Sequence, residues 1–306
     1  MPVESLPLGE LSALGSALLW ALNAVMLRPL TASIPALRVT ALQYAVVSVF
    51  ILLVALVLGR LDDALHIPSL QAAALVGAAL VGMGVGDTSY IRALGLLGVA
   101  RSFTFATSGY VLLTTVLAAL FLAEPVSLKT VAGAAILLTG MYLVVQAANL
   151  TNGAQAGVPA RTSESARGPY VGLAFCLLAA VCWGFTASTL KPALMDVDVL
   201  AANSLRIPAV ALMLNAASLG YHRFDASVYR PRVVLRAGLA GIFGLGLGSL
   251  LFLYAIQEAG AGKTAILSST APVFAAVLAL IVLRERPTRS LAVGTALSVA
   301  GTWLVV

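Results

Sequence analysis

Residues 18–30 read L-L-W-A-L-N-A-V-M-L-R-P-L, and residues 181–194 read V-C-W-G-F-T-A-S-T-L-K-P-A-L. Trp20 aligns with Trp183 in this pair, and both stretches continue to a basic residue followed by a proline. The return of one pattern after about half of the chain is typical of an internal duplication. The stretch therefore predicts that the chain consists of two copies of one structural unit.

The spacing of this repeat holds to the end of the chain. The stretch G-A-A-I-L-L-T-G-M-Y-L-V-V at 133–145 returns as G-T-A-L-S-V-A-G-T-W-L-V-V at 294–306, and Arg38 aligns with Arg206. We therefore divide the chain into three parts, which are a first repeat at 11–147, a polar linker at 148–168 and a second repeat at 169–306.

The composition predicts that both repeats lie in a bilayer. Of the 306 residues, 60% are hydrophobic and only 10% are charged, and the mean hydropathy is +1.02. A soluble domain carries about 25% charged residues, and a spanning helix needs about 20 apolar residues. Ten segments of this kind alternate with the charged residues, at 11–27, 39–59, 67–90, 102–123, 130–147, 168–190, 199–221, 237–257, 264–283 and 290–306. We expect an all-α integral membrane protein with ten transmembrane helices.

Five helices in each repeat fix the relation between the two halves. Because five is odd, the second repeat must enter the membrane from the opposite side. Two inverted five-helix repeats are typical of secondary transporters, whose substrate site lies between the repeats near the middle of the membrane. A purely structural duplication without a site stays open as the alternative. Little chain is left for a soluble domain, which argues against a receptor or a tethered enzyme.

These motifs resemble the drug/metabolite transporter superfamily, in its ten-helix EamA-type branch with two EamA domains. The resemblance covers 11–147 and 169–306, and S-S-T-A-P-V-F-A-A-V-L-A at 268–279 is similar to the family's fourth helix. In the other half, S-G-Y-V at 108–111 lacks the proline that Pro272 supplies. The remaining motifs are W-A-L-N and W-G-F-T on the first helices, L-R on the second, L-A-E-P-V-S and L-R-E-R-P-T after the fourth, and two glycines on each fifth helix. The resemblance implies a carrier of small organic solutes such as amino acids.

The stretch G-M-G-V-G-D at 82–87 admits three interpretations, which are a phosphate-binding loop, an aspartyl protease site and a helix contact. It aligns with G-L-G-L-G-S at 244–249, so the glycines are repeated and the aspartate is not. A phosphate loop of this kind needs a strand before it, and aspartyl chemistry needs a second carboxylate, whereas the other acids lie at segment ends or in loops. Small residues four apart share a helix face and let helices approach closely. The predicted helix-packing glycines are Gly82, Gly86, Gly244 and Gly248.

Asp87 is the acidic residue that the repeat does not explain. The predicted third span places it near the helix end, on the side that carries Arg28, Arg38, Arg92 and Arg101. An ion pair with one of these arginines is the first interpretation, because intramembrane acids usually pair. A site for a coupling proton or a substrate amine is the second, and a solvated residue at the membrane interface is the third.

Polar and aromatic residues within the spans are the candidates for substrate binding. Such groups are costly in hydrocarbon, so we expect them to face protein or a water-filled cavity. For each serine or threonine, a hydrogen bond to a carbonyl of its own helix is the alternative. The candidates are Trp20, Asn23, Gln43, Tyr44, Ser108, Tyr110, Trp183, Thr186, Tyr254, Ser268, Ser269 and Thr270.

Arg38 and Arg206 start the second helix of each repeat and join Asp87 as candidates for a charge or coupling role. Each arginine could extend its side chain to the membrane surface or hold a substrate carboxylate. The only histidines, His66 and His222, are predicted in loops, and no metal-binding motif occurs. We therefore predict no catalytic residue, no metal and no cofactor.

The predicted function is that of a secondary transporter in the inner (plasma) membrane, not of an enzyme. It would export a small organic metabolite such as an amino acid by alternating access between the repeats. The expected partners are this solute and membrane lipid, with no nucleic acid, and the chain is expected to function as a monomer. A lipid or lipid-carrier flippase on the same fold stays open, and so does an intramembrane enzyme, which we favour less.

The basic residues predict an orientation that differs from the one the resemblance implies. Members of this branch are expected to hold both termini in the cytoplasm. Short cytoplasmic loops collect lysine and arginine, and 13 of the 18 lie in loops on the side opposite the termini. The charge count therefore favours termini outside and a cytoplasmic loop at 222–236, which could contact anionic lipid.

Overall fold

The computed structural model describes residues 8–121, 128–154, 162–194, 197–221, 226–259, 264, 267–284 and 288–305, and this part of the chain contains helices and no strand. The first repeat contains α1 (Leu8–Leu27), α2 (Ala36–Val57), α4 (Ser69–Ala79), the π-helix η2 (Leu80–Gly86), α5 (Asp87–Leu97), α6 (Val99–Phe121) and α7 (Leu128–Ala154). The second repeat contains α8 (Thr162–Ala193), α9 (Val199–Tyr221), α10 (Pro231–Gly241), the π-helix η4 (Ile242–Gly248), α11 (Ser249–Ala259), α13 (Ala271–Leu283) and α14 (Arg289–Val305). Short helices η1 (Leu30–Ala32), α3 (Leu61–Leu65) and η3 (Ala226–Tyr229) lie between spans. Each of the ten predicted spans contains a described helix or a continuous run of described helices.

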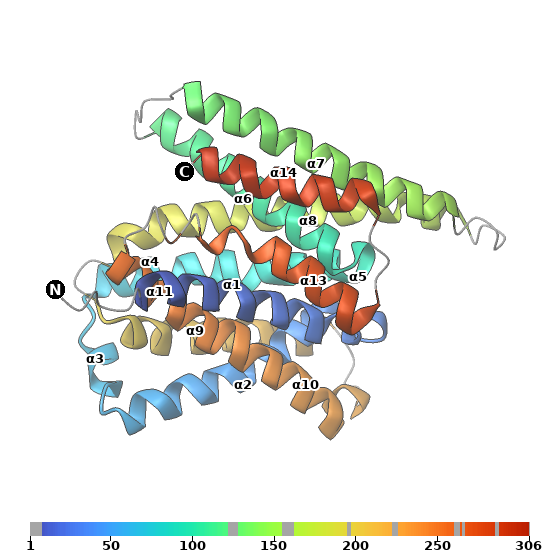
Figure 1. Cartoon of the computed structure of the whole chain (residues 1–306). Helices are drawn as coiled ribbons and strands as arrows, with labels where there is room; N and C mark the ends of the chain where they lie inside the picture. The colour runs from blue at the N-terminus through green and yellow to red at the C-terminus, as the bar shows by residue number, and fades with distance from the viewer. Residues whose placement is uncertain are drawn as a thin grey trace.

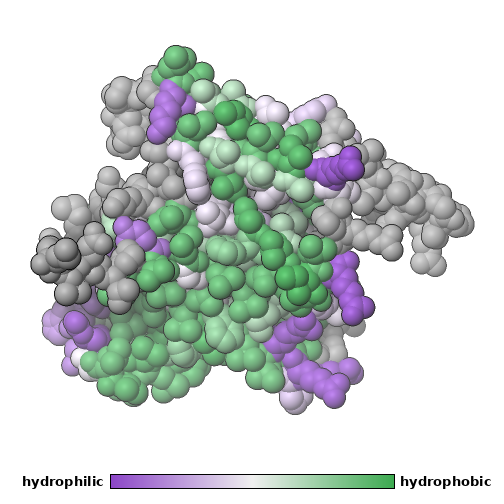
Figure 2. Space-filling model, in the orientation of Figure 1, coloured by the Kyte–Doolittle hydropathy of each residue, from purple (hydrophilic) through white to green (hydrophobic). Residues whose placement is uncertain are grey.

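The surface of these helices is suited to lipid. Figure 2 shows hydrophobic side chains over the middle of the molecule and hydrophilic ones gathered toward its two ends. Six helices of the described part are long and apolar enough to cross a membrane, which are Leu8–Leu27, Ala36–Val57, Ser69–Leu97, Gly168–Thr186, Val199–Tyr221 and Pro231–Ala255. The apolar helices Leu128–Val144 and Ala271–Leu283 are shorter. The protein is thus an all-α, multi-pass membrane protein.

The two repeats run in opposite directions. In Figure 1, α1 begins and α14 ends toward the same end of the bundle, whereas α7 ends and α8 begins toward the other. The two fifth helices, α7 and α14, lie along each other at one edge. Glycine permits this contact, because a Cβ atom on Gly140 would lie 2.6 Å from the backbone nitrogen of Ser298.

The third span of each repeat is longer than predicted. It runs over residues 69–97 in the first repeat rather than 67–90, so Asp87 lies in its interior and not near its end. The π-helix η2 directly precedes Asp87, and η4 directly precedes Ser249 at the equivalent position. Short π-helical turns inside α-helices occur frequently at functional sites.

Helical structure extends into the predicted polar linker from both sides. Helix α7 continues to Ala154 and α8 begins at Thr162, so both helices extend into 148–168. Residues 155–161, the motif at 122–127 and residues 285–287 of the second motif lie outside the described part.

The fourth spans differ between the repeats. Helix α6 continues without interruption through 108–111, whereas α13 begins at Ala271 with Pro272 in its first turn. Proline is favoured there because its missing N–H has no partner in the first turn of a helix. Residues 267 and 268 are helical, and a turn at Ser269 and Thr270 separates them from the start of α13.

Candidate functional site

A cavity of about 350 Å³ lies between the two repeats, and helices from both repeats line it. Its volume is in the range of pockets for small molecules, roughly 300–1,000 Å³. Many of the predicted site residues line this cavity. They are Trp20, Asn23, Gln43, Asp87, Ser108, Tyr110, Trp183, Thr186, Arg206, Ser268 and Ser269. The internal repeat thus brings the polar candidates of both halves around one space.

Two equivalent aromatic pairs contribute to the walls of this cavity. The rings of Trp20 and Phe252 lie 5.0 Å apart between centres, and those of Trp183 and Tyr90 lie 5.5 Å apart. Each pair joins the first helix of one repeat to the third span of the other. The sequence interpretation missed Phe252 and Tyr90, although they are related by the offset that aligns the repeated glycines.

The repeated glycines bring those helices into close contact. A Cβ atom on Gly86 would lie 3.0 Å from the Cβ atom of Cys182 and 3.1 Å from the Trp183 ring. A Cβ atom on Gly248 would lie 3.2 Å from the Trp20 ring. In the same way, Gly82 contacts Thr186 and Gly244 contacts Asn23. The third span of each repeat therefore packs on the first helix of the other repeat.

Asp87 is held by two neutral hydrogen-bond donors. The Tyr44 hydroxyl donates to its Oδ2 at 2.5 Å, and the Trp183 Nε1–H donates to its Oδ1 at 2.8 Å. The predicted ion pair with Arg28, Arg38, Arg92 or Arg101 is wrong, since none of these described arginines pairs with the carboxylate. The longer span is the reason, because it places Asp87 away from the helix end where those arginines were expected.

Arg206 is buried and lines the cavity from α9. Only 3% of its surface is exposed, so it does not extend to the membrane surface. Its Nη1 donates to the Asn203 Oδ1 at 3.3 Å and its Nη2 to the Met83 sulfur at 3.9 Å, whereas its Nε has no partner. Among the described residues, no carboxylate forms an ion pair with it.

Four predicted site residues do not line the cavity. Tyr44 is fully buried and donates a hydrogen bond to Asp87, which lines the cavity. The Thr270 hydroxyl donates to the Leu267 carbonyl at 2.6 Å. A local bond of this kind to the backbone was the alternative to a role in substrate binding. Tyr254 and Arg38 lie outside the lining, and Tyr254 is 39% exposed. The expected place of Tyr44, Tyr254 and Thr270 in the cavity wall is therefore wrong, and Arg38, for which two roles were open, does not line this cavity.

Two further polar contacts link the helices around the cavity. The Gln43 Nε2 donates to the Asn23 Oδ1 at 2.9 Å, which joins α2 to α1. The Thr186 hydroxyl donates to the Ala78 carbonyl at 2.8 Å, which joins α8 to α4. Both contacts satisfy polar groups that would be costly to leave unpaired inside a membrane protein.

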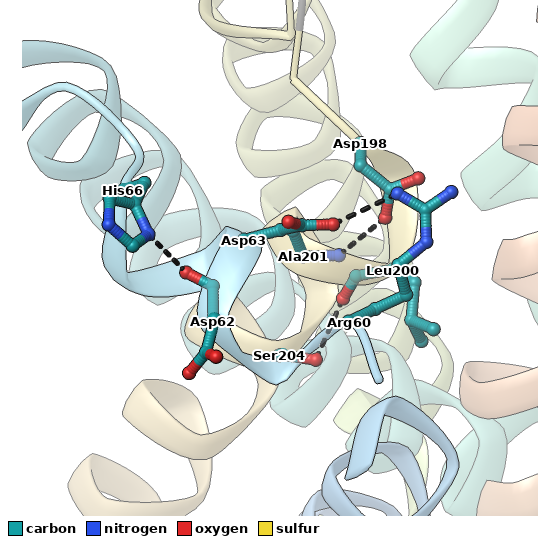
Figure 3. Close-up of polar contacts among 8 residues, drawn as sticks. All are labelled: Arg60, Asp62, Asp63, His66, Asp198, Leu200, Ala201 and Ser204. Carbon is teal, nitrogen blue, oxygen red and sulfur yellow. Dashed lines mark hydrogen bonds and ion pairs between the residues drawn. The ribbon is translucent and has the colours of Figure 1, made fainter. Parts of the chain in front are cut away.

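Three other acids, Asp62, Asp63 and Asp198, lie where α3 approaches the start of α9 (Figure 3). The Arg60 Nη1 pairs with the Asp63 Oδ2 at 2.9 Å, and Asp198 accepts the Ala201 N–H at 2.9 Å. The hydrogen bond to Asp63 and the negative charge of Asp198 raise the pKa of the Arg60 guanidinium. Within the described residues, no group of three histidine, cysteine, aspartate or glutamate side chains could hold a metal ion.

Comparison with known proteins identifies both repeats. Residues 7–146 and residues 170–306 each match the EamA-like transporter family. An uncharacterised transporter of Archaeoglobus fulgidus is 26% identical over 278 residues, which cover 90% of this chain and 90% of that protein. A protein of known crystal structure aligns with a TM-score of 0.67 at 20% identity, covering 97% of this chain and 95% of the other. That structure supports the fold.

Proposed function

This chain belongs to the EamA-like transporter family and is a membrane transporter, and from that premise we propose that it is a secondary carrier that exports small organic metabolites such as amino acids. Transport would proceed by alternating access around the cavity between the repeats. The inverted arrangement of the helices supports this mechanism, because carriers built from inverted repeats bind their substrates near the middle of the membrane.

The single observation that carries the proposal is the two-sided lining of the cavity. Trp20 with Phe252 and Trp183 with Tyr90 contribute equivalent aromatic pairs to it. Equivalent contacts on both sides of one site can open and close in turn with little difference in free energy, as alternating access requires. Both pairs belong to one chain, which supports a carrier that functions as a monomer.

The lining also supports a carrier over an enzyme. Among the described residues, Asp87 is the acidic side chain in the lining, whereas aspartyl chemistry uses two carboxylates that share a proton. We place the protein in the plasma membrane, with the transported solute and lipid as its partners.

Flux through liposomes tests the proposed function. Purified full-length protein would be reconstituted, and labelled amino acids would be followed across the vesicle membrane. We expect solute movement that saturates with concentration and that protein-free vesicles do not show. No flux of any small solute, together with movement of a labelled lipid between leaflets, would replace the carrier by a flippase.

The charge distribution supports an orientation with both termini outside the cell. Single cysteines at Leu65 and at Tyr229 test it, since α3 and η3 lie on opposite sides of the membrane in the ten-helix arrangement. The two native cysteines, Cys176 and Cys182, are buried, so they give little background. An impermeant thiol reagent should label Leu65→Cys in intact cells and leave Tyr229→Cys unlabelled. The reverse pattern would place both termini in the cytoplasm.

A further inference from the structure

Two side chains of opposite charge, the half-buried Asp87 and the buried Arg206, line the cavity without neutralising each other. Asp87 lies at the start of α5 in the first repeat, and Arg206 lies in α9 of the second. They do not form an ion pair with one another, because Asp87 accepts from Tyr44 and Trp183 and Arg206 donates to Asn203 and Met83. Charges inside a membrane protein usually pair with each other or mark a substrate pathway. Each of these two groups therefore needs a counter-charge that the described chain does not supply.

The guanidinium N–H donors of Arg206 that lack a strong acceptor fit a carboxylate. A guanidinium presents five N–H donors in a planar fork that matches carboxylate geometry. The two partners that Arg206 has are an amide oxygen at 3.3 Å and a thioether sulfur at 3.9 Å, which are both neutral and long. Its Nε–H is buried without any partner. An unpaired buried charge of this kind is costly, and an anionic group in the cavity would remove the cost.

The acceptor positions that remain on the Asp87 carboxylate fit an ammonium group. Each carboxylate oxygen accepts one hydrogen bond, from Tyr44 on one side and from Trp183 on the other. An ionised carboxylate offers about four acceptor positions, so positions remain on both oxygens. The two donors fix the orientation of the carboxylate while leaving its charge without a cation among the described residues.

We propose that the cavity recognises zwitterions, with Arg206 binding the carboxylate of the solute and Asp87 binding its ammonium group. The inference rests on the proposed carrier function and narrows its substrates to molecules that carry both charges, such as free α-amino acids. The solute would then bridge the two repeats, because its two charged groups bind residues of different repeats. The aromatic pairs that line the same cavity would contact an apolar or aromatic side chain of the solute.

The repeat itself supplies the matched control. Arg38 occupies the position equivalent to Arg206, but it does not line the cavity. Its replacement by glutamine removes the same charge from the same kind of helix. A selectivity change that follows Arg206 and not Arg38 therefore reports on the cavity rather than on the general charge of the protein.

Three solutes with one side chain test the proposal in liposomes that contain the full-length protein. They are phenylalanine, phenethylamine, which lacks the carboxylate, and 3-phenylpropanoate, which lacks the amine. We expect the wild type to transport phenylalanine at least about 30-fold better than either analogue, since losing one partner of a buried charge pair has an effect of this size or more. Arg206→Gln should lower the ratio of phenylalanine to phenethylamine by about 30-fold, and Asp87→Asn should do the same for 3-phenylpropanoate. Arg38→Gln should leave both ratios unchanged.

The outcomes separate this proposal from the function on which it rests. Saturable transport of either analogue at the rate of phenylalanine would refute two-charge recognition and leave the carrier intact. An Asp87→Asn variant that keeps its selectivity and loses only its dependence on a pH gradient would assign the carboxylate to a coupling proton. Movement of labelled phosphatidylethanolamine, whose headgroup carries both charges, without flux of phenylalanine would overturn both proposals.

Thermal unfolding of the wild type provides a measurement that needs no variant to fold. Phenylalanine should raise the midpoint of unfolding in detergent in a saturable way, because a ligand that binds only the folded state stabilises it. The two analogues at the same concentration should not. Equal shifts with all three compounds would contradict the proposal.

Discussion

The segments η2–α5 and η4–α11 have the same backbone and different chemistry. In both, a π-helix with glycines at every second position packs on a tryptophan from the first helix of the other repeat. In one segment the next residue is Asp87, which accepts the indole N–H of Trp183. In the other it is Ser249, whose hydroxyl donates to the Leu245 carbonyl of its own helix at 2.5 Å.

This difference separates the role of the scaffold from the role of the site. The glycines and the two tryptophans are repeated because both repeats need the same close helix contact. The carboxylate occurs once, as does the buried guanidinium of Arg206, whose equivalent Arg38 lies outside the cavity. A symmetric scaffold therefore encloses an asymmetric site, which suits a solute with two different ends.

Leucine in place of Gly86 or of Gly248 should destabilise the protein to about the same extent. Gly86→Leu and Gly248→Leu each force a side chain into a contact of 3.0–3.2 Å with the opposing helix. We expect each to lower the free energy of unfolding by about 3 kcal/mol or more, at the upper end of overpacking effects. The yield of monodisperse protein in detergent and its unfolding midpoint measure this loss.

Gly77→Leu is the matched control for those two variants. Gly77 lies in α4, in the same span as Gly86, and a Cβ atom there meets nothing within 4 Å. Leucine is also a better helix former than glycine, so stability should be unchanged or slightly higher. Wild-type stability of Gly86→Leu or Gly248→Leu would contradict the close contact between the third span and the opposite first helix.

Replacing each of the two tryptophans should have a different effect on stability in the two segments. Trp183→Phe removes the hydrogen bond to Asp87, and bonds to charged groups contribute about 1.5–3 kcal/mol. Trp20→Phe removes ring area beside Phe252 but no hydrogen bond that the structure records. We expect Trp183→Phe to lose about 2 kcal/mol more in thermal unfolding than Trp20→Phe. Equal losses would mean that the carboxylate does not depend on its indole donor.

The two polar residues next to the tryptophans should differ less. Asn23→Ala leaves the buried amide of Gln43 without its partner, whereas Thr186→Ala removes a hydroxyl that donates to a helix carbonyl. An unsatisfied buried group costs about 1–3 kcal/mol and an ordinary hydrogen bond contributes about 1 kcal/mol. Asn23→Ala should therefore be the more destabilising by about 1 kcal/mol, as thermal unfolding of both variants can measure. A larger loss with Thr186→Ala would reverse the order.

We expect the smallest change in stability at Ser249, the uncharged residue at the position equivalent to Asp87. Ser249→Ala removes hydrogen bonds to the Leu245 and Gly246 carbonyls of its own helix, at 2.5 and 3.1 Å. Such bonds add little to a helix that is already formed. Its unfolding free energy should stay within about 0.5 kcal/mol of the wild type. A loss comparable with that of Trp183→Phe would give Ser249 a structural role equivalent to Asp87.

The repeat made most of the fold predictable. The apolar runs between charged residues predicted the ten helices, and the repeat predicted their inversion and the candidates Trp20, Asn23, Trp183 and Thr186, which line one cavity. Hydropathy could not give the true end of the third span, because its last turns contain polar residues such as Arg92. This error placed Asp87 at a helix end and led to the wrong ion pair.

Other parts of the site were beyond what periodicity can show. An α-helical spacing of four residues does not reveal a π-helix, so the stripe of glycines gave the contact but not the helix geometry around it. Tyr44 was predicted as a cavity residue, but it is fully buried outside the lining and donates to Asp87. Which of Arg38 and Arg206 faces the cavity depends on the tertiary packing of α2 and α9, and the aligned motif is the same for both.

The exchange of contacts between repeats also bears on how such a chain could have arisen. The glycine face of each third span is covered by the first helix of the other repeat, through Trp183 on Gly86 and Trp20 on Gly248. A single repeat made alone would leave its glycine face uncovered. An ancestral gene that encoded one repeat would therefore have needed two copies of its product, inserted in opposite orientations, before the genes fused. Separately expressed halves of the present chain should restore the protein only when both are made in the same cell.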